Sequence, residues 1–139
     1  MMTDISYTFQ PIGFIRSDLT RREDAPRQGY EGAPDAWIEV SASVAQALHG
    51  ITIGDALIIL TWFHRSARDV LQVHPRGEIE NPLTGVFATR SPDRPNPIGL
   101  HRVTVLEING NSLKVGPIEA IDGTPVIDIK PVLPQSADS

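Results

Sequence analysis

The stretch TRSPDRPNPIGL, residues 89–100, limits the possible conformations of this chain more than any other segment. Three of its residues are proline. Each proline fixes its own φ, removes a backbone donor and pushes the residue before it toward an extended conformation. We therefore expect a stiff, extended arm that holds Arg90 and Arg94 at nearly fixed positions. Such an arm would lose little entropy on binding a ligand, although an ordinary proline-rich connector would have the same composition.

Short apolar or alternating segments, separated by turn residues, predict about eight strands and one or two short helices. The 12 prolines and 11 glycines are spread without a repeat, which favours many turns over a helix bundle. An antiparallel β-barrel is the expected solution, because closure removes exposed strand edges. The expected strands cover residues 9–16, 36–40, 56–64, 69–74, 85–89, 100–108, 112–115 and 126–129, with a helix at 44–48 and tight turns at 109–111 and 122–125.

The length of 139 residues predicts a single domain, residues 1–139, with a proper core. Residues 17–35 lack apolar periodicity and are expected to form a long loop near the N-terminus, of the kind that is often functional. The continuous apolar strand 56–64 predicts that both of its faces are covered, one of them by a helix or a second subunit. Residues 134–139 are expected to be a disordered tail.

The charge and the absence of targeting signals restrict the class of protein. A net charge of −5 argues mildly against broad electrostatic binding of nucleic acid. Ten of the 12 cations are arginines, however, and all ten lie between Arg16 and Arg102, where their planar forks suit carboxylates, phosphates and bases. The chain has no cysteine, no signal peptide and no apolar run that could span a bilayer. These features predict a cytoplasmic protein with no membrane association.

Several common sites can be excluded by their motifs. The sequence has no dinucleotide-binding or phosphate-binding glycine loop and no nucleophilic serine in G-x-S-x-G. Its four histidines lie on different expected elements, without the spacing of metal ligands, so no metal site is expected. The polar turns that remain predict a rigid site for an anionic or zwitterionic small ligand, but they do not identify the reaction. The polar turns that would form this site are 26–28, 64–65, 90–96 and 122–125.

Two long motifs carry a family resemblance: GVFATRSPDRPNPIGL at 85–100 and DGTPVIDIKP at 122–131. Together with PIG at 11–13, PRQ at 26–28 and WFHR at 62–65, they make residues 9–133 resemble the TrmO (TsaA-like) family. The resemblance implies a small β-barrel, usually a homodimer, that binds S-adenosyl-L-methionine without a Rossmann fold. It also implies N6-methylation of threonylcarbamoyladenosine at tRNA position 37, here by a short form without the C-terminal domain of longer members.

The resemblance assigns site residues by motif. The modified base has a urea-like N6, a poor nucleophile, so its deprotonation or anion stabilisation is expected. Candidates for this step, which the sequence does not rank, are His64, Asp122 and an arginine such as Arg94 or Arg90. Asp93, Arg94 and Asn96 would face the substrate. A sensor that binds the cofactor without turnover, and a methyltransferase with another substrate, remain alternatives. The implied cofactor contacts are Pro26, Arg27, Gln28, His64, Arg65, Arg90, Leu100, Asp122, Gly123, Thr124 and Pro125.

Overall fold

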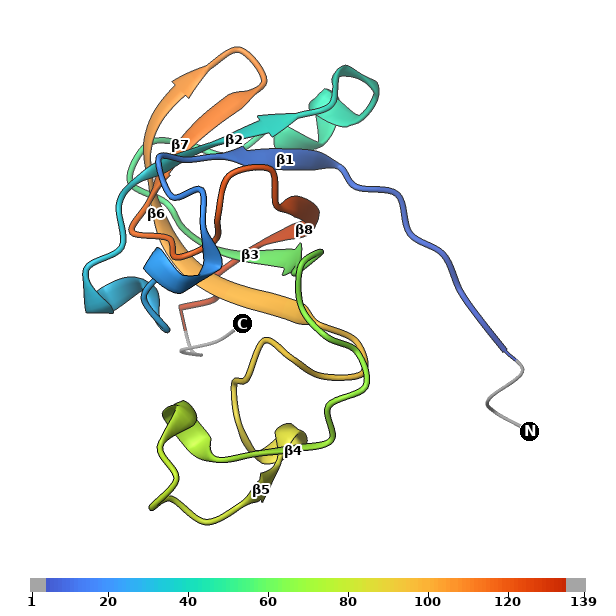
Figure 1. The fold of residues 1–139 in the computed structure, drawn as a ribbon. Helices are drawn as coiled ribbons and strands as arrows, with labels where there is room; N and C mark the ends of the chain where they lie inside the picture. The colour runs from blue at the N-terminus through green and yellow to red at the C-terminus, as the bar shows by residue number, and fades with distance from the viewer. Residues whose placement is uncertain (1–4, 135–139) are drawn as a thin grey trace.

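Six antiparallel strands close into a small barrel in the computed structural model, which describes residues 5–134 (Figure 1). The strands are neighbours in the order β1-β2-β7-β6-β3-β8. This arrangement confirms the predicted fold class, a mainly β protein built on an antiparallel barrel. The barrel strands are β1 (Gly13–Arg16), β2 (Ala36–Val40), β3 (Ala56–Trp62), β6 (Ile98–Asn109), β7 (Ser112–Gly116) and β8 (Pro125–Pro131).

Alternation along the strands produces the core. β3 pairs with β6 in continuous register from Ala56 opposite Thr104 to Trp62 opposite Ile98. From Ile98 to Val105 every second residue of β6 is buried, as expected for a strand with one face inside the barrel, and the last four residues of the strand are exposed. The interior is filled by branched aliphatic side chains from all six strands, each worth about 1.5–3 kcal/mol on full burial. Residues of the core include Ile15, Ile38, Ile59, Val103, Val115 and Val126.

A separate lobe, residues 63–97, lies between β3 and β6 and hangs below the barrel in Figure 1. It contains a two-stranded sheet of β4 (Gln72–Val73) and β5 (Thr84–Gly85) and two 3-10 helices, η5 (Pro75–Gly77) and η6 (Val86–Ala88). The strand predicted at 69–74 is therefore much shorter, and the strand predicted at 85–89 is wrong. The reason is local: Arg94 donates to the carbonyls of Val86 and Thr89, which holds this segment in a turn.

The remaining segments follow the expectations with shifted boundaries. The first strand starts at Gly13 and not at residue 9. The helix expected at 44–48 is the 3-10 helix η4 (Ala42–Leu48), and Gly50 behind it has a φ of 101°, a conformation that suits glycine. The long loop 17–35 contains only the short turns η2 (Arg22–Asp24) and η3 (Gly29–Glu31).

Of the tail expected at 134–139, residues 135–139 lie outside the described part of the chain. Within residues 5–134, no helix combines the length and apolarity needed to cross a bilayer.

Candidate functional site

The long loop, residues 17–35, is fixed at its start to the turn that precedes β8. The backbone N–H of Ser17 donates to Asp122 Oδ1 at 3.0 Å, and the N–H of Asp122 donates to the Leu19 carbonyl at 2.6 Å. Thr124 is buried and donates its hydroxyl to the Ile121 carbonyl. The predicted turn 122–125 is therefore rigid, with Asp122 and Gly123 exposed, and Pro125 is the first residue of β8.

The same loop reaches the end of β3 and the lobe. Arg22 pairs with Asp93 at 2.9 Å and also donates to the Arg65 carbonyl at 3.4 Å. Arg65 donates in return to the Thr20 carbonyl at 3.3 Å. A second ion pair, between Arg76 and Glu31 at 2.8 Å, joins the far end of the loop to the lobe. The loop thus brings together the end of β3, the arm and the turn at Asp122.

The three side chains expected to face a substrate have partners within the protein. Asp93 accepts from the Ala67 N–H at 2.9 Å as well as from Arg22. Burial raises the pKa of Asp93, but the hydrogen bonds and the charge of Arg22 outweigh it and leave that pKa below its ordinary value. The Asn96 side-chain oxygen accepts from Arg68 at 2.8 Å. These contacts brace the arm, and a substrate-binding role for Asp93 and Asn96 stays a prediction.

Arg94 holds the arm in shape. Its guanidinium donates to the carbonyls of Val86, Thr89 and Ser91 at 3.0–3.1 Å. Its backbone N–H donates to the Ala67 carbonyl at 3.0 Å. The stiffness expected from the prolines is therefore supplemented by side-chain hydrogen bonds, and the arm bends instead of running straight. Three of the five guanidinium donors of Arg94 are directed at backbone, not at solvent.

Three arginines of the predicted site form no salt bridge among residues 5–134. They are Arg27 on the long loop, Arg65 after β3 and Arg90 on the arm, and all three are exposed. Arg16, Arg21, Arg22 and Arg76, in contrast, each pair with a carboxylate. A guanidinium outside a salt bridge keeps most of its donors available for a carboxylate or phosphate. Pro26 and Gln28, beside Arg27, are partly buried.

The edge of β6 at Leu100 is open. β7 pairs with β6 only from Thr104 onward, so residues 98–103 have a strand partner on one side alone. The Phe63 N–H bonds the Pro97 carbonyl. By the alternation of an antiparallel ladder, Leu100 then directs its N–H and C=O away from β3. Neither group has a backbone partner among the described residues. Leu100 therefore offers a donor and an acceptor from the main chain, the pattern that suits the edge of a base.

His64 follows the end of β3 and is exposed. Partial desolvation lowers its pKa, and the charge of Arg65 lowers it further. The imidazole is thus largely neutral at pH 7 and can accept a proton. No group of three or more His, Asp or Glu side chains within residues 5–134 is arranged to hold a metal ion.

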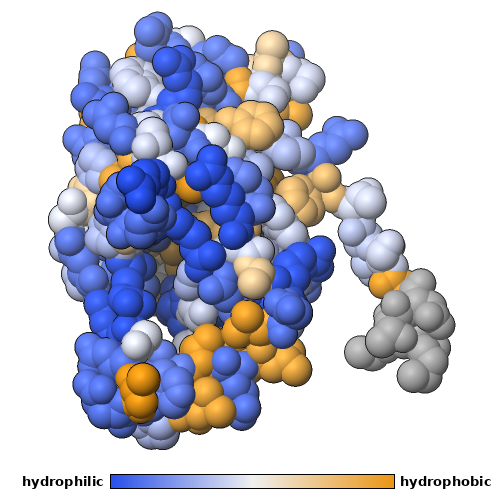
Figure 2. All heavy atoms as spheres, viewed as in Figure 1, coloured by the Kyte–Doolittle hydropathy of each residue, from blue (hydrophilic) through white to orange (hydrophobic). Residues whose placement is uncertain are grey.

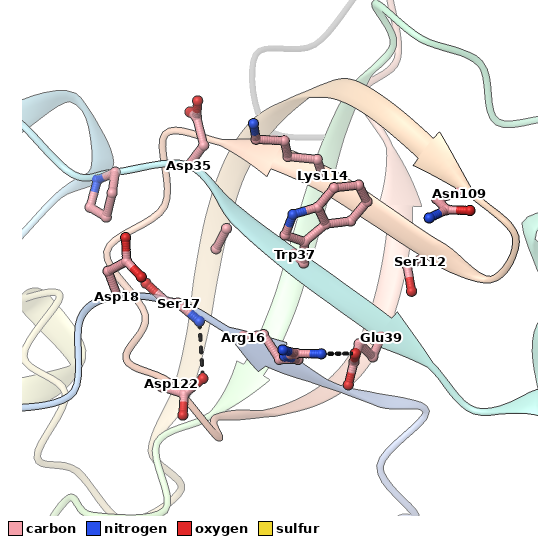
Figure 3. Close-up of a pocket in the computed structure, with 12 residues that line it drawn as sticks. Arg16, Ser17, Asp18, Asp35, Trp37, Glu39, Asn109, Ser112, Lys114 and Asp122 are labelled. Atoms are coloured by element: carbon pink, nitrogen blue, oxygen red, sulfur yellow. Dashed lines mark hydrogen bonds and ion pairs between the residues drawn. The ribbon is translucent and has the colours of Figure 1, made fainter.

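A groove of about 800 Å³ lies elsewhere, on the outside of β1, β2 and β7 (Figure 3). Of the predicted site residues it contains only Asp122, which points to Ser17 at one end (Figure 3). Trp37 lies across the middle, and the Arg16–Glu39 ion pair crosses below it (Figure 3). Four carboxylates against two cations line this groove, so it does not attract a phosphate backbone.

Two residues near the site were not singled out from the sequence. His101 and Glu119 are hydrogen-bonded inside the barrel end, close to the long loop. In the sequence, His101 is one of four scattered histidines. Its burial could be predicted in part, because it lies at an inward position of the alternating strand β6.

A profile described as the tRNA-methyltransferase O N-terminal domain matches residues 14–139. The chain belongs to this TrmO N-terminal domain family. A relative from Archaeoglobus fulgidus, named an S-adenosyl-L-methionine-binding protein, is 45% identical over 126 residues, covering 91% of this chain and 89% of the relative. The tRNA (adenine(37)-N6)-methyltransferase of Escherichia coli is 38% identical over 138 residues, covering 93% of this chain and 59% of that protein.

Solved TrmO structures share the fold. The crystal structure of TrmO from P. aeruginosa superimposes with a TM-score of 0.76 at 32% identity, covering 97% of this chain. The match takes in 58% of that TrmO chain, so this chain spans little more than half the length of the full TrmO proteins. The resemblance inferred from the motifs of the sequence is therefore confirmed.

Proposed function

We propose that this chain is a cytoplasmic, single-domain methyltransferase that binds S-adenosyl-L-methionine and methylates N6 of threonylcarbamoyladenosine at tRNA position 37. The observation that carries the proposal is that one loop, which includes Arg27, is hydrogen-bonded both to Arg65 after β3 and to the acidic turn at Asp122. The open edge of β6 at Leu100 adds main-chain groups that suit a base. Family membership and the name of the E. coli relative support the choice of tRNA.

The donors and acceptors present fit the proposed cofactor. Arg27, Arg65 or Arg90 would bind its carboxylate, since each has free fork donors. The main chain of Leu100 would bind the adenine edge. Asp122 uses Oδ1 for Ser17 and keeps Oδ2 for a ribose hydroxyl. When bound, S-adenosyl-L-methionine supplies a methyl group already activated by its sulfonium, so the residues of this chain have chiefly to align the acceptor.

His64 is our proposed proton acceptor. Its lowered pKa keeps the imidazole neutral near pH 7, as a base requires. Arg94 is less suited to proton transfer, because a guanidinium stays protonated and three of its donors are held by backbone carbonyls. We assign Asp122 to binding and not to proton transfer, because one of its oxygens already fixes the long loop.

We also propose that the chain acts as a homodimer. The lobe exposes several large apolar side chains, and Figure 2 shows them gathered at the bottom of the molecule. Leu71, Ile79, Leu83 and Phe87 are 54–83% exposed. A second copy covering this apolar surface would explain its composition. Phe87→Glu should then shift the protein from dimer to monomer in sedimentation equilibrium, and an unchanged mass would exclude this face.

A cofactor-binding protein without methyl transfer is the second candidate. The A. fulgidus relative is named only for S-adenosyl-L-methionine binding, and the net charge of −5 gives no general attraction to tRNA. Under this alternative the arginines would bind the cofactor carboxylate and nothing more.

Two measurements decide between the candidates. Purified protein is incubated with methyl-labelled S-adenosyl-L-methionine and tRNA from cells lacking the protein, and the nucleosides are analysed by mass spectrometry. Appearance of N6-methylated threonylcarbamoyladenosine supports the methyltransferase. Binding of the cofactor in calorimetry without any methylated nucleoside supports the sensor, and absence of binding refutes both.

Site assignment is tested with matched arginine variants. Arg90→Ala should weaken cofactor binding about tenfold or more, as loss of a charge-assisted hydrogen bond implies. Arg21→Ala is the control, because Arg21 pairs with Glu23 at 2.5 Å on an exposed turn. Equal affinity of both variants would remove Arg90 from the site.

A further inference from the structure

A buried polar chain connects β3, β6 and the segment between β7 and β8, and it ends beside Gly29 of the long loop. Thr61 Oγ1 lies 2.7 Å from His101 Nε2, and His101 Nδ1 is hydrogen-bonded to Glu119 Oε1. Thr61 is fully buried, and the side chains of His101 and Glu119 are 1% and 13% exposed. The rings of Phe63 and His101 are perpendicular, with 5.8 Å between their centroids. Both ring nitrogens are therefore occupied, and the imidazole fixes the carboxylate of Glu119 from behind.

The second carboxylate oxygen of Glu119 has no such partner. Oε2 makes no hydrogen bond within residues 5–134. In that part of the chain every buried side-chain nitrogen or oxygen has a partner, so Oε2 reaches solvent. It points to the loop at Gly29, where a side-chain carbon would lie only 3.2 Å from it. Gly29 directly follows Pro26-Arg27-Gln28, so the free oxygen opens beside a predicted cofactor segment.

We propose that Glu119 binds a hydrogen-bond donor of S-adenosyl-L-methionine, with His101 and Thr61 as positioning residues behind it. This inference rests on the cofactor binding proposed above. The arginines nearby can bind only the acceptor groups of this zwitterion. Its ribose hydroxyls and its α-ammonium need an acceptor, and a carboxylate accepts from either with a charge-assisted bond. Glu119 provides such an acceptor in a fixed orientation, with little freedom left to lose.

Calorimetry with two cofactor analogues tests the inference. S-adenosylhomocysteine has both the ribose and the α-ammonium, whereas 5′-methylthioadenosine keeps the ribose and lacks the amino-acid part. Glu119→Gln should weaken S-adenosylhomocysteine binding about tenfold or more. An equal loss for 5′-methylthioadenosine identifies the ribose as the donor, and a loss confined to S-adenosylhomocysteine identifies the ammonium.

The controls separate this inference from the function on which it rests. Glu107→Gln is the matched variant, because Glu107 pairs with Lys114 on the barrel surface. Wild-type affinity for both ligands in Glu119→Gln overturns the inference alone. Failure of the wild-type protein to bind S-adenosyl-L-methionine overturns the proposed function and the inference with it.

A measurement on the wild-type protein covers the case in which Glu119→Gln does not fold. The imidazole of His101 is bonded to Glu119, so its NMR resonances report on that carboxylate. They should shift when S-adenosylhomocysteine is added. Resonances that stay unmoved at saturation refute the contact.

Discussion

Gly99 offers a sharp test of how the barrel end is packed, through the substitution Gly99→Ala. Gly99 is buried on β6. A methyl group on its Cα would lie 2.4 Å from Thr61 Oγ1, 2.5 Å from Phe63 Cζ and 2.7 Å from His101 Nε2. Real side-chain carbons do not approach heavy atoms this closely, so at least one neighbour must move. Thr61 and His101 are buried, and neither can swing out to solvent.

The expected cost follows from these contacts. Overpacking of a filled interior costs about 1–3 kcal/mol, and loss of the buried Thr61–His101 hydrogen bond adds about 1–3 kcal/mol. Replacing glycine with alanine lowers the conformational entropy of the unfolded chain, which offsets about 0.4–1 kcal/mol of this cost. Gly99→Ala should therefore lower the free energy of unfolding by about 1–5.5 kcal/mol. With a urea m-value of about 2 kcal/mol/M, the midpoint falls by roughly 0.5–2.8 M.

Gly85→Ala is the matched control. Gly85 is exposed, its φ of −60° suits alanine, and a side-chain carbon there meets no atom within 4 Å. Its urea midpoint should stay unchanged or rise slightly. If Gly99→Ala and Gly85→Ala unfold at the same urea concentration with the same m-value, the packing argument is refuted.

Three further changes test the strand pairing and the arm. Gly13→Ala would place a carbon 2.2 Å from the Glu39 carbonyl, so the β1–β2 pairing must open and the melting temperature should fall by several degrees. Asp93→Asn should cost about 1–2 kcal/mol at pH 7. Because the pKa of Asp93 is lowered by folding, its contribution is present above the unfolded value and is lost as the pH falls. The difference from wild type in urea unfolding should therefore shrink below about pH 4, and a constant difference would contradict this. Arg94→Lys should speed hydrogen exchange in residues 86–91, since an ammonium cannot bond all three carbonyls; unchanged exchange would show that these bonds are dispensable.

The barrel was predictable because its signals are local. β2 was predicted with its observed bounds, and β3 ends two residues earlier than expected, where Trp62 gives way to a polar turn. The lobe was less predictable. Val86 to Ala88 have the composition of a strand, but Arg94 donates to the carbonyls of Val86 and Thr89, and this contact has no sequence period. Strand propensity was overridden by these side-chain hydrogen bonds.

The segments of the candidate site were chosen from the sequence and their binding roles stay predictions, whereas the contacts between these segments are visible only in the structure. The motifs named Asp122 and Arg65, and the structure connects both to the long loop. The role of Arg94 in bracing the arm was not foreseen, because guanidinium-to-backbone bonds leave no pattern in a sequence. Glu119 was missed for a similar reason. Its partner His101 lies 18 positions away, and only the closure of the barrel brings the two together.

The lobe also has a consequence for how the chain can be rearranged. Trp62 and Ile98, the residues on either side of it, face each other across the β3–β6 ladder. The lobe is thus an insertion in the β3–β6 hairpin, and its two ends lie next to each other. Exchanging it for a tight turn should leave the register of the barrel intact. The lobe of another family member could be grafted at the same two residues. The graft would replace Arg90 and its neighbours and leave the strands unchanged.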